Sequence, residues 1–67
     1  MNRLKMRGRI VEFFGTQQRF AQHLGQTEQT VSKKLHGKSD FSQEDIVRWC
    51  DALKIPTAEV GELFFAD

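Results

Sequence analysis

The pattern of apolar and polar positions along the chain predicts short helices and no sheet. Apolar residues recur at intervals of three, four, seven or eight residues in two clear sets, Met6-Ile10-Phe13-Phe14 and Ile46-Trp49-Cys50-Leu53. Such intervals place side chains on one face of a helix. Alternation of apolar and polar residues over the length of a strand is absent from the sequence. The pattern therefore predicts an all-α chain.

Glycine, proline and small polar residues divide the chain between these helices. Gly15, Gly25 and Gly37 follow helical stretches, and glycine is common there because it adopts a left-handed backbone at little cost. Pro56 ends another stretch, because the residue before proline disfavours the helical region. We expect five short helices over about 5–14, 17–24, 28–36, 43–54 and 57–65, with residues 1–4 as a mobile end. The expected N-caps are Thr16, Thr27, Ser42 (in a capping box with Asp45) and Thr57.

The length and composition indicate one small domain over residues 1–67. Sixty-seven residues support only one modest core, and a single cysteine excludes an internal disulfide. The sequence lacks the roughly 20 consecutive apolar residues of a membrane span and the features of a signal peptide. We expect a cytoplasmic protein without a membrane partner.

The sequence also lacks the patterns of a catalytic or metal site. His23, His36 and Cys50 do not follow the spacing of zinc ligands. Ser-His-Asp and Cys-His arrangements, glycine-rich phosphate loops and carboxylates paired in a cleft are not found. We interpret Cys50 as a small core residue, because the adjacent Asp51 does not favour a reactive thiolate. The expectation is a protein that is not an enzyme and uses no metal, cofactor or small-molecule substrate.

Charge is divided unequally along the chain although the net charge is only +1. Residues 1–38 contain eight Lys and Arg against two Asp and Glu, a net charge of +6, whereas residues 39–67 contain two against seven, a net charge of −5. This asymmetry favours an N-terminal half that faces a polyanion. The alternative is that the charges occupy solvated faces without a partner.

The stretch 17–37 combines two short helices with a tight turn at Gly25-Gln26-Thr27. Its second helix has only Val31 and Leu35 as inner apolar residues. We expect its outer side to carry small polar residues and lysines, namely Glu28, Gln29, Thr30, Ser32, Lys33 and Lys34. A helix with this outer face suits the major groove of DNA.

The same stretch resembles the lambda-type repressor and Cro family of helix-turn-helix proteins, the Xre type. The residues that carry the resemblance are Gln17, Ala21, Gly25, Val31 and Leu35, within the run FAQHLGQTEQTVSKKLHGK, and the likeness extends over about residues 8–64. It implies a lambda repressor-like fold of five helices with a helix-turn-helix at the second and third. It also implies a dimeric, sequence-specific transcriptional regulator, most similar to a small phage Cro or single-domain repressor. The alternative function is the DNA-binding antitoxin of a toxin–antitoxin pair.

The resemblance implies that the helix over 28–36 enters the major groove of double-stranded operator DNA. The base-contacting residues are then Thr27, Glu28, Gln29, Ser32 and Lys33. Glutamine pairs with adenine, lysine with guanine, and serine with either. Glu28 departs from the neutral residue of many relatives. It either accepts a hydrogen bond from cytosine N4 or only stabilises the start of the helix.

Residues on both sides of this helix are expected to contact DNA phosphates. The first helix of the motif presents free N–H groups at its start, which suit a phosphate. The candidates are Thr16, Gln17, Gln22, His36, Lys38 and Ser39. Lys34 either joins them or is a solvated lysine. Arg3, Lys5, Arg7 and Arg9 either reach the DNA or cover the solvated side of the first helix, and their spacing slightly favours the second alternative.

A single helix in the groove reads few base pairs, so a homodimer on two half-sites is expected, weak in the absence of DNA. The candidate surface is the C-terminal helix over 57–65. That helix is too short to bury all of its apolar residues in its own core, so at least one is exposed or meets a partner. The expected dimer contacts are Val60, Leu63 and Phe65.

Overall fold

The structure is a computed structural model that describes residues 1–65 of the chain. Its five α-helices are α1 (Arg3–Phe14), α2 (Gln17–Leu24), α3 (Glu28–Leu35), α4 (Gln43–Leu53) and α5 (Thr57–Val60), and a π-helical turn, η1 (Gly61–Phe65), continues α5. Residues 1–65 contain no strand. The prediction of an all-α chain with five short helices is confirmed.

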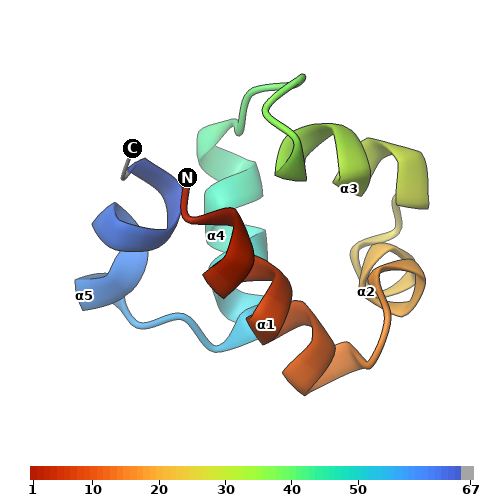
Figure 1. The fold of residues 1–67 in the computed structure, drawn as a ribbon, viewed down its shortest axis with the longest axis horizontal. Coiled ribbons are helices and arrows are strands. Elements are labelled where there is room, and N and C mark those ends of the chain that lie inside the picture. The colour runs from red at the N-terminus through yellow and green to blue at the C-terminus, as the bar shows by residue number, and fades with distance from the viewer. Residues whose placement is uncertain (66–67) are drawn as a thin grey trace.

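The helices form a compact bundle of 26 × 23 × 21 Å. In Figure 1, α1 and α4 occupy the middle, α2 and α3 lie on the right, and α5 lies on the left. The α1 helix contacts α2, α4 and η1, so it lies at the centre of the packing. The N-terminal residues lie beside η1, the last turn of the described chain (Figure 1). Within residues 1–65, none of the helices has the length and apolar character needed to cross a membrane.

Three of the four predicted N-caps are confirmed. The Thr16 hydroxyl accepts a hydrogen bond from the backbone N–H of Arg19, and the Thr27 hydroxyl accepts one from Thr30. Ser42 and Asp45 form the predicted capping box, with both reciprocal hydrogen bonds present. The prediction for the fifth helix is wrong. Pro56 occupies the N-cap position, and no side chain caps the helix, because the proline ring has no oxygen that could accept a hydrogen bond from the first turn.

The expectation of a mobile N-terminus is also wrong. The α1 helix begins at Arg3, and the Asn2 side chain caps it by accepting a hydrogen bond from the backbone N–H of Lys5 at 3.2 Å. The backbone N–H of Asn2 donates to the carbonyl of Leu63 at 3.1 Å. Both ends of the described chain are therefore held together, and the first turn of α1 is fixed.

A chain of aromatic rings runs through the core. Phe14, Phe20 and Trp49 contact in sequence, with ring centroids 5.2 and 4.8 Å apart. Phe41, which the pattern placed in a loop, extends the chain by packing 4.8 Å from Trp49 and 5.1 Å from Phe64. Phe13 does not join the core as its helical spacing predicted and is 42% exposed. Loop and helices therefore share one core, whose buried residues are Met6, Ile10, Phe20, Ala21, Leu24, Val31, Leu35, Trp49, Leu53, Ile55, Leu63 and Phe64.

Candidate nucleic-acid interface

The corner between α2 and α3 is built from one glycine and one alanine. Gly25 adopts the left-handed conformation, with φ of 72°, and its N–H donates to the Gln22 carbonyl at 3.1 Å. The next N–H, of Gln26, donates to the Ala21 carbonyl at 2.9 Å. The side chain of Ala21 is 1% exposed, so a larger residue there would separate the two helices. These contacts set the angle at which α3 leaves α2.

The outer side of α3 is free of other helices within the described chain. Val31 and Leu35 are buried, whereas Glu28, Gln29 and Lys33 are exposed. Ser32 is half-buried. Thr27 is exposed, and its hydroxyl is hydrogen-bonded to the hydroxyl of Thr30 at 2.9 Å. The five predicted base-contacting residues therefore lie at the surface of one short helix and its cap.

Lys34 does not lie on this outer side, and both sequence interpretations of it are wrong. Its residue is only 8% exposed, and its ammonium lies 3.0 Å from the Asp45 carboxylate. The ammonium also donates to the Asp40 carbonyl at 3.0 Å and lies 5.7 Å from the centre of the Phe41 ring. The fold turns this lysine toward α4 because a carboxylate, a carbonyl and an aromatic face are all available there.

The environment of Asp45 stabilises its charged form. Burial alone would raise the pKa of this carboxyl. The backbone N–H of Ser42, the Lys34 ammonium and the Ser42 hydroxyl outweigh burial, so the pKa of Asp45 lies below its usual value. Asp45 thus lies in the first turn of α4 as a charged residue.

The predicted phosphate contacts fall into two groups that adjoin one another. Thr16, Gln17 and Gln22 lie on α2 or its cap, and His36, Lys38 and Ser39 follow α3. Gln17 and Ser39 are half-buried and the other four are exposed. Gln17 and His36 line one shared hollow, together with residues of α1. The structure therefore brings one member of each group together, which the sequence pattern did not predict.

The four basic residues of α1 divide into two pairs with different surroundings. Arg9 donates to both carboxylate oxygens of Glu59, at 2.9 and 3.1 Å, and to the carbonyls of Leu53 and Lys54. Lys5 donates to Glu62 at 2.8 Å, and this hydrogen bond raises the pKa of Lys5. Lys5 and Arg9 therefore fasten α1 to the C-terminal helix and are not free for DNA.

Arg3 and Arg7 face the other way. The Arg3 guanidinium donates to Nδ1 of His36 at 3.0 Å. Arg7 is exposed and, like Arg3, forms no ion pair within residues 1–65. The alternative that all four residues cover a solvated side is therefore wrong for Arg9, which is half-buried, whereas Lys5 is exposed as that alternative expects, and no contact decides it for Arg3 and Arg7.

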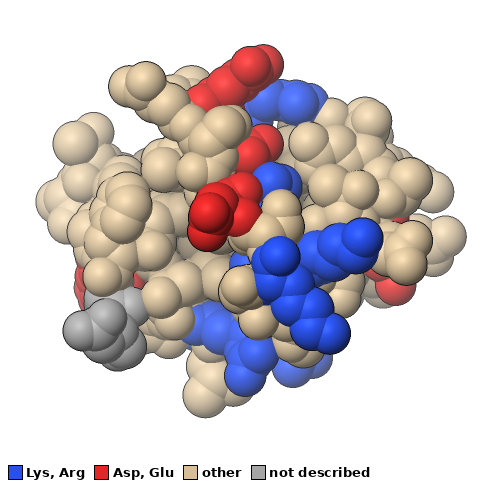
Figure 2. Space-filling view, turned by 90° about the horizontal axis from the view of Figure 1, so that it is seen from above, with Lys and Arg blue, Asp and Glu red and all other residues tan. Residues whose placement is uncertain are grey.

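On the face shown in Figure 2, most of the blue Lys and Arg side chains gather in the lower and right-central part, whereas blue and red groups lie side by side at the centre and top. Three of the eight basic residues in 1–38 form ion pairs with carboxylates of 39–65, namely Lys5, Arg9 and Lys34. The basic surface is thus carried by the other five, Arg3, Arg7, Arg19, Lys33 and Lys38, which are all exposed.

Comparison with known proteins places the chain in a family. The chain belongs to the family DUF739, described as a protein of unknown function. The match extends over residues 2–67 and so includes all five helices and η1. No curated protein matches the sequence.

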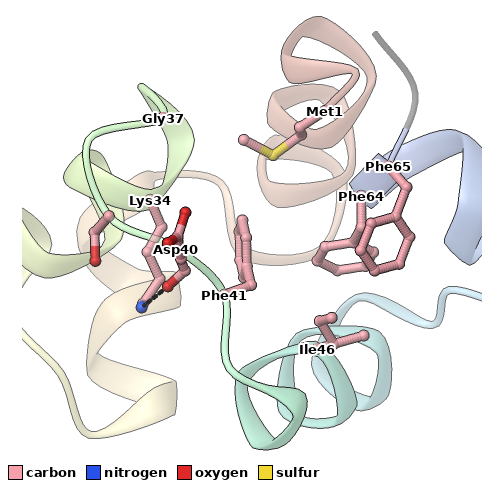
Figure 3. A pocket seen from close by; sticks show the side chains of 9 residues that line it. Met1, Lys34, Gly37, Asp40, Phe41, Ile46, Phe64 and Phe65 are labelled. Carbon is pink, nitrogen blue, oxygen red and sulfur yellow. Dashed lines mark hydrogen bonds between the residues drawn. The ribbon is translucent and has the colours of Figure 1, made fainter.

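The C-terminal surface differs from the expected dimer contact at one residue. Leu63 is fully buried in the chain's own core, because η1 packs against α1. Its assignment to a dimer surface is wrong. Val60 is half-buried and Phe65 is 68% exposed, so these two remain at the surface. In Figure 3, Phe64 and Phe65 lie at one end of a hollow, Phe41 lies beside Phe64, and Lys34 and Asp40 lie at the other end.

The residues considered for metal or redox chemistry lie apart from this interface. Within residues 1–65, no three His, Cys, Asp or Glu side chains are placed to hold a metal ion. Burial raises the pKa of the Cys50 thiol, and Cys50 packs against the core from α4. This environment disfavours the thiolate and agrees with a structural role for Cys50.

Proposed function

We propose that this protein binds double-stranded DNA in a sequence-specific manner as a homodimer and acts as a Cro-like transcriptional repressor. In this proposal α2 and α3 form a helix-turn-helix, and α3 lies in the major groove. The observation that carries it is the free outer side of α3, where Gln29 and Lys33 are exposed beside Ser32, while the buried side of the helix carries Val31, Lys34 and Leu35. Repression follows if the bound dimer occludes a promoter.

The side chains on α3 have the chemistry needed to read bases. Gln29 can pair with adenine N6 and N7, and Lys33 can donate to guanine O6 and N7. Ser32 can bond to either, and the Thr27 methyl can contact a thymine methyl. Each good pair discriminates against the wrong base by about 1–3 kcal/mol. The outer face of α3 therefore supports specificity over a few base pairs.

The flanking residues would hold the protein on the DNA backbone. Thr16 and Gln17 stand at the start of α2, where free N–H groups and the helix dipole favour an anion. Lys38 and Ser39 follow the end of α3. Contacts of this kind position a protein on DNA without reading its sequence. A two-fold dimer then places two copies of α3 about 34–36 Å apart, on half-sites one turn of DNA apart.

Selection of binding sites from a random duplex pool, followed by gel-shift titration at two salt concentrations, tests this proposal. We expect an inverted repeat with half-sites one helical turn apart. Lys33→Ala should lose affinity and relax one base position. The matched control is Lys54→Asn, which removes the same charge at the end of α4, where asparagine tolerates the left-handed backbone of Lys54. Equal binding to all sequences by the wild type would refute sequence-specific recognition.

A further inference from the structure

A hollow of about 440 Å³ lies between α1 and the adjoining ends of α2 and α3. We call it the basic hollow. Its walls come from three helices and the residue after α3: Arg3, Leu4, Arg7, Gln17, Leu35 and His36. The sequence separates these residues by up to 33 positions, and only the packing of α1 against the α2–α3 corner brings them together.

The basic hollow has two cationic side chains and no carboxylate in its lining. Arg3 and Arg7 stand one turn apart on α1, and neither forms an ion pair within residues 1–65. The intervening Lys5 is bound to Glu62 on the opposite side of the helix. Two like charges that face one concave surface without a counter-charge raise the local concentration of anions. The hollow therefore favours an anionic ligand.

The contact between Arg3 and His36 adds a further donor. Arginine has only N–H donors, so the His36 Nδ1, at 3.0 Å from the Arg3 guanidinium, accepts. The other ring nitrogen, Nε2, is then left as a donor for another group. The amide of Gln17, at the start of α2, supplies a donor from the neighbouring wall. Arginine, histidine and amide donors together match the oxygens of a phosphate.

The position of the hollow identifies which phosphate it would meet. It adjoins the last turn of α3 through Leu35 and the first turn of α2 through Gln17. If α3 lies in the major groove, the DNA backbone that borders the groove passes these two helix ends. We propose that the basic hollow binds a backbone phosphate of the DNA, with Arg3 and Arg7 as contacts. This inference rests on the proposed function and extends the interface to α1.

The salt dependence of DNA binding tests the inference, because each phosphate contact contributes about one to the slope of log K against log salt. We expect Arg3→Gln and Arg7→Gln each to lower that slope by about 1, equally on the selected site and on random DNA. A fourfold rise in salt should then weaken each variant about 3.5 times less than the wild type. Lys5→Gln is the matched control, since it removes one charge from the same helix on the acidic side, and it should keep the wild-type slope.

The outcomes separate this inference from the proposed function. If Arg3→Gln and Arg7→Gln keep the wild-type salt slope while Lys33→Ala still binds DNA more weakly, the phosphate contact in the basic hollow is refuted and the proposed function is not. Failure of the wild type to bind DNA would overturn both. The wild type is also titrated with inorganic phosphate, and binding is followed by the amide chemical shifts of Gln17 and His36. This titration distinguishes a site for a free small anion from a site for a DNA phosphate. Saturable phosphate binding together with unchanged slopes would overturn DNA as the occupant. Thermal melting of each variant confirms that it folds, and both arginines are exposed, so little loss of stability is expected.

Discussion

The Lys34 ammonium lies 3.0 Å from the Asp45 carboxylate and joins the last turn of α3 to the first turn of α4. Both side chains are largely removed from water, with exposed fractions of 10% and 15%. The same carboxylate accepts from the backbone N–H of Ser42 at 2.9 Å and completes the capping box of α4. One ion pair therefore links the end of the proposed recognition helix to the start of the helix that carries Trp49.

Lys34→Met should destabilise the fold. Removal of one partner leaves a buried carboxylate without its counter-charge, which costs about 3–5 kcal/mol in fully buried pairs. We expect about 3 kcal/mol, because the Asp45 carboxylate keeps its hydrogen bond from the backbone N–H of Ser42. Chemical denaturation measures the loss. The adjacent exposed Lys33→Met is the control and should change stability by no more than about 0.5 kcal/mol. Equal effects of the two substitutions would contradict the assignment of the ion pair.

The lowered pKa of Asp45 predicts a loss of stability in acid. A carboxyl whose pKa is depressed in the folded state contributes stability above its unfolded value, here about 3.8, and loses it as the pH falls through the folded value. Denaturation curves between neutral pH and strong acid measure this. Other carboxylates titrate in the same range, so the comparison is with Asp45→Asn. The difference in stability between wild type and variant should shrink as the pH falls below 3.8. A constant difference would show that the charge of Asp45 is not involved.

Glu28→Gln distinguishes two roles for the acidic residue at the start of α3. Glu28 is exposed, and within residues 1–65 it has no ion-pair partner. If it only stabilises the helix start, worth about 0.3–1 kcal/mol, its removal should tighten binding to all sequences because repulsion from phosphates is lost. If it reads cytosine, one base position should relax, at a cost of about 1–3 kcal/mol. Site selection on the variant separates these results, and no change in either quantity refutes both.

Phe65→Ser should weaken the proposed dimer. Phe65 is 68% exposed beside the hollow that Phe41 and Phe64 line, so its contribution to the folded monomer is small. Burial of a phenylalanine against a partner is worth about 1.5–3 kcal/mol, which is on the order of tenfold or more in the dimer constant. Analytical ultracentrifugation with and without DNA measures this constant. Val11→Ser, at a residue 58% exposed on α1, is the control. Unchanged stoichiometry and affinity in Phe65→Ser would place the dimer contact elsewhere.

Local physics explains which features could be predicted from sequence. The caps at Thr16, Thr27 and Ser42 depend on hydrogen bonds over three residues, so their spacing in the chain is sufficient. The left-handed Gly25 depends on its own backbone. Asn2 carries the same local indication, because it is a capping residue directly before the helix that begins at Arg3. Helix positions and most of the core were therefore accessible to sequence reasoning.

The sequence did not predict which charged residues are buried and paired. A lysine at position 34 has a long, flexible side chain, and its helical position alone fits either a solvated or a buried ammonium. The ammonium is buried because the loop after α3 brings the Asp45 carboxylate and the Asp40 carbonyl within 3.0 Å of it. Leu63 is a similar case. The sequence shows that it belongs to an apolar helix face, but it does not show whether that face packs against the chain's own core or against a partner.

The amino-acid sequence alone determined the five helices, the tight α2–α3 corner and the polar character of the residues on α3. These properties depend on the period of apolar positions and on caps and turns a few residues long. Only the tertiary structure decided which of the basic residues remain free. Lys5, Arg9 and Lys34 meet carboxylates that are distant in sequence, or across a loop, whereas Arg3 and Arg7 meet Gln17 and His36 in a shared hollow. Charge pairing depends on distance in space, and the packing of α1 and α4 sets that distance.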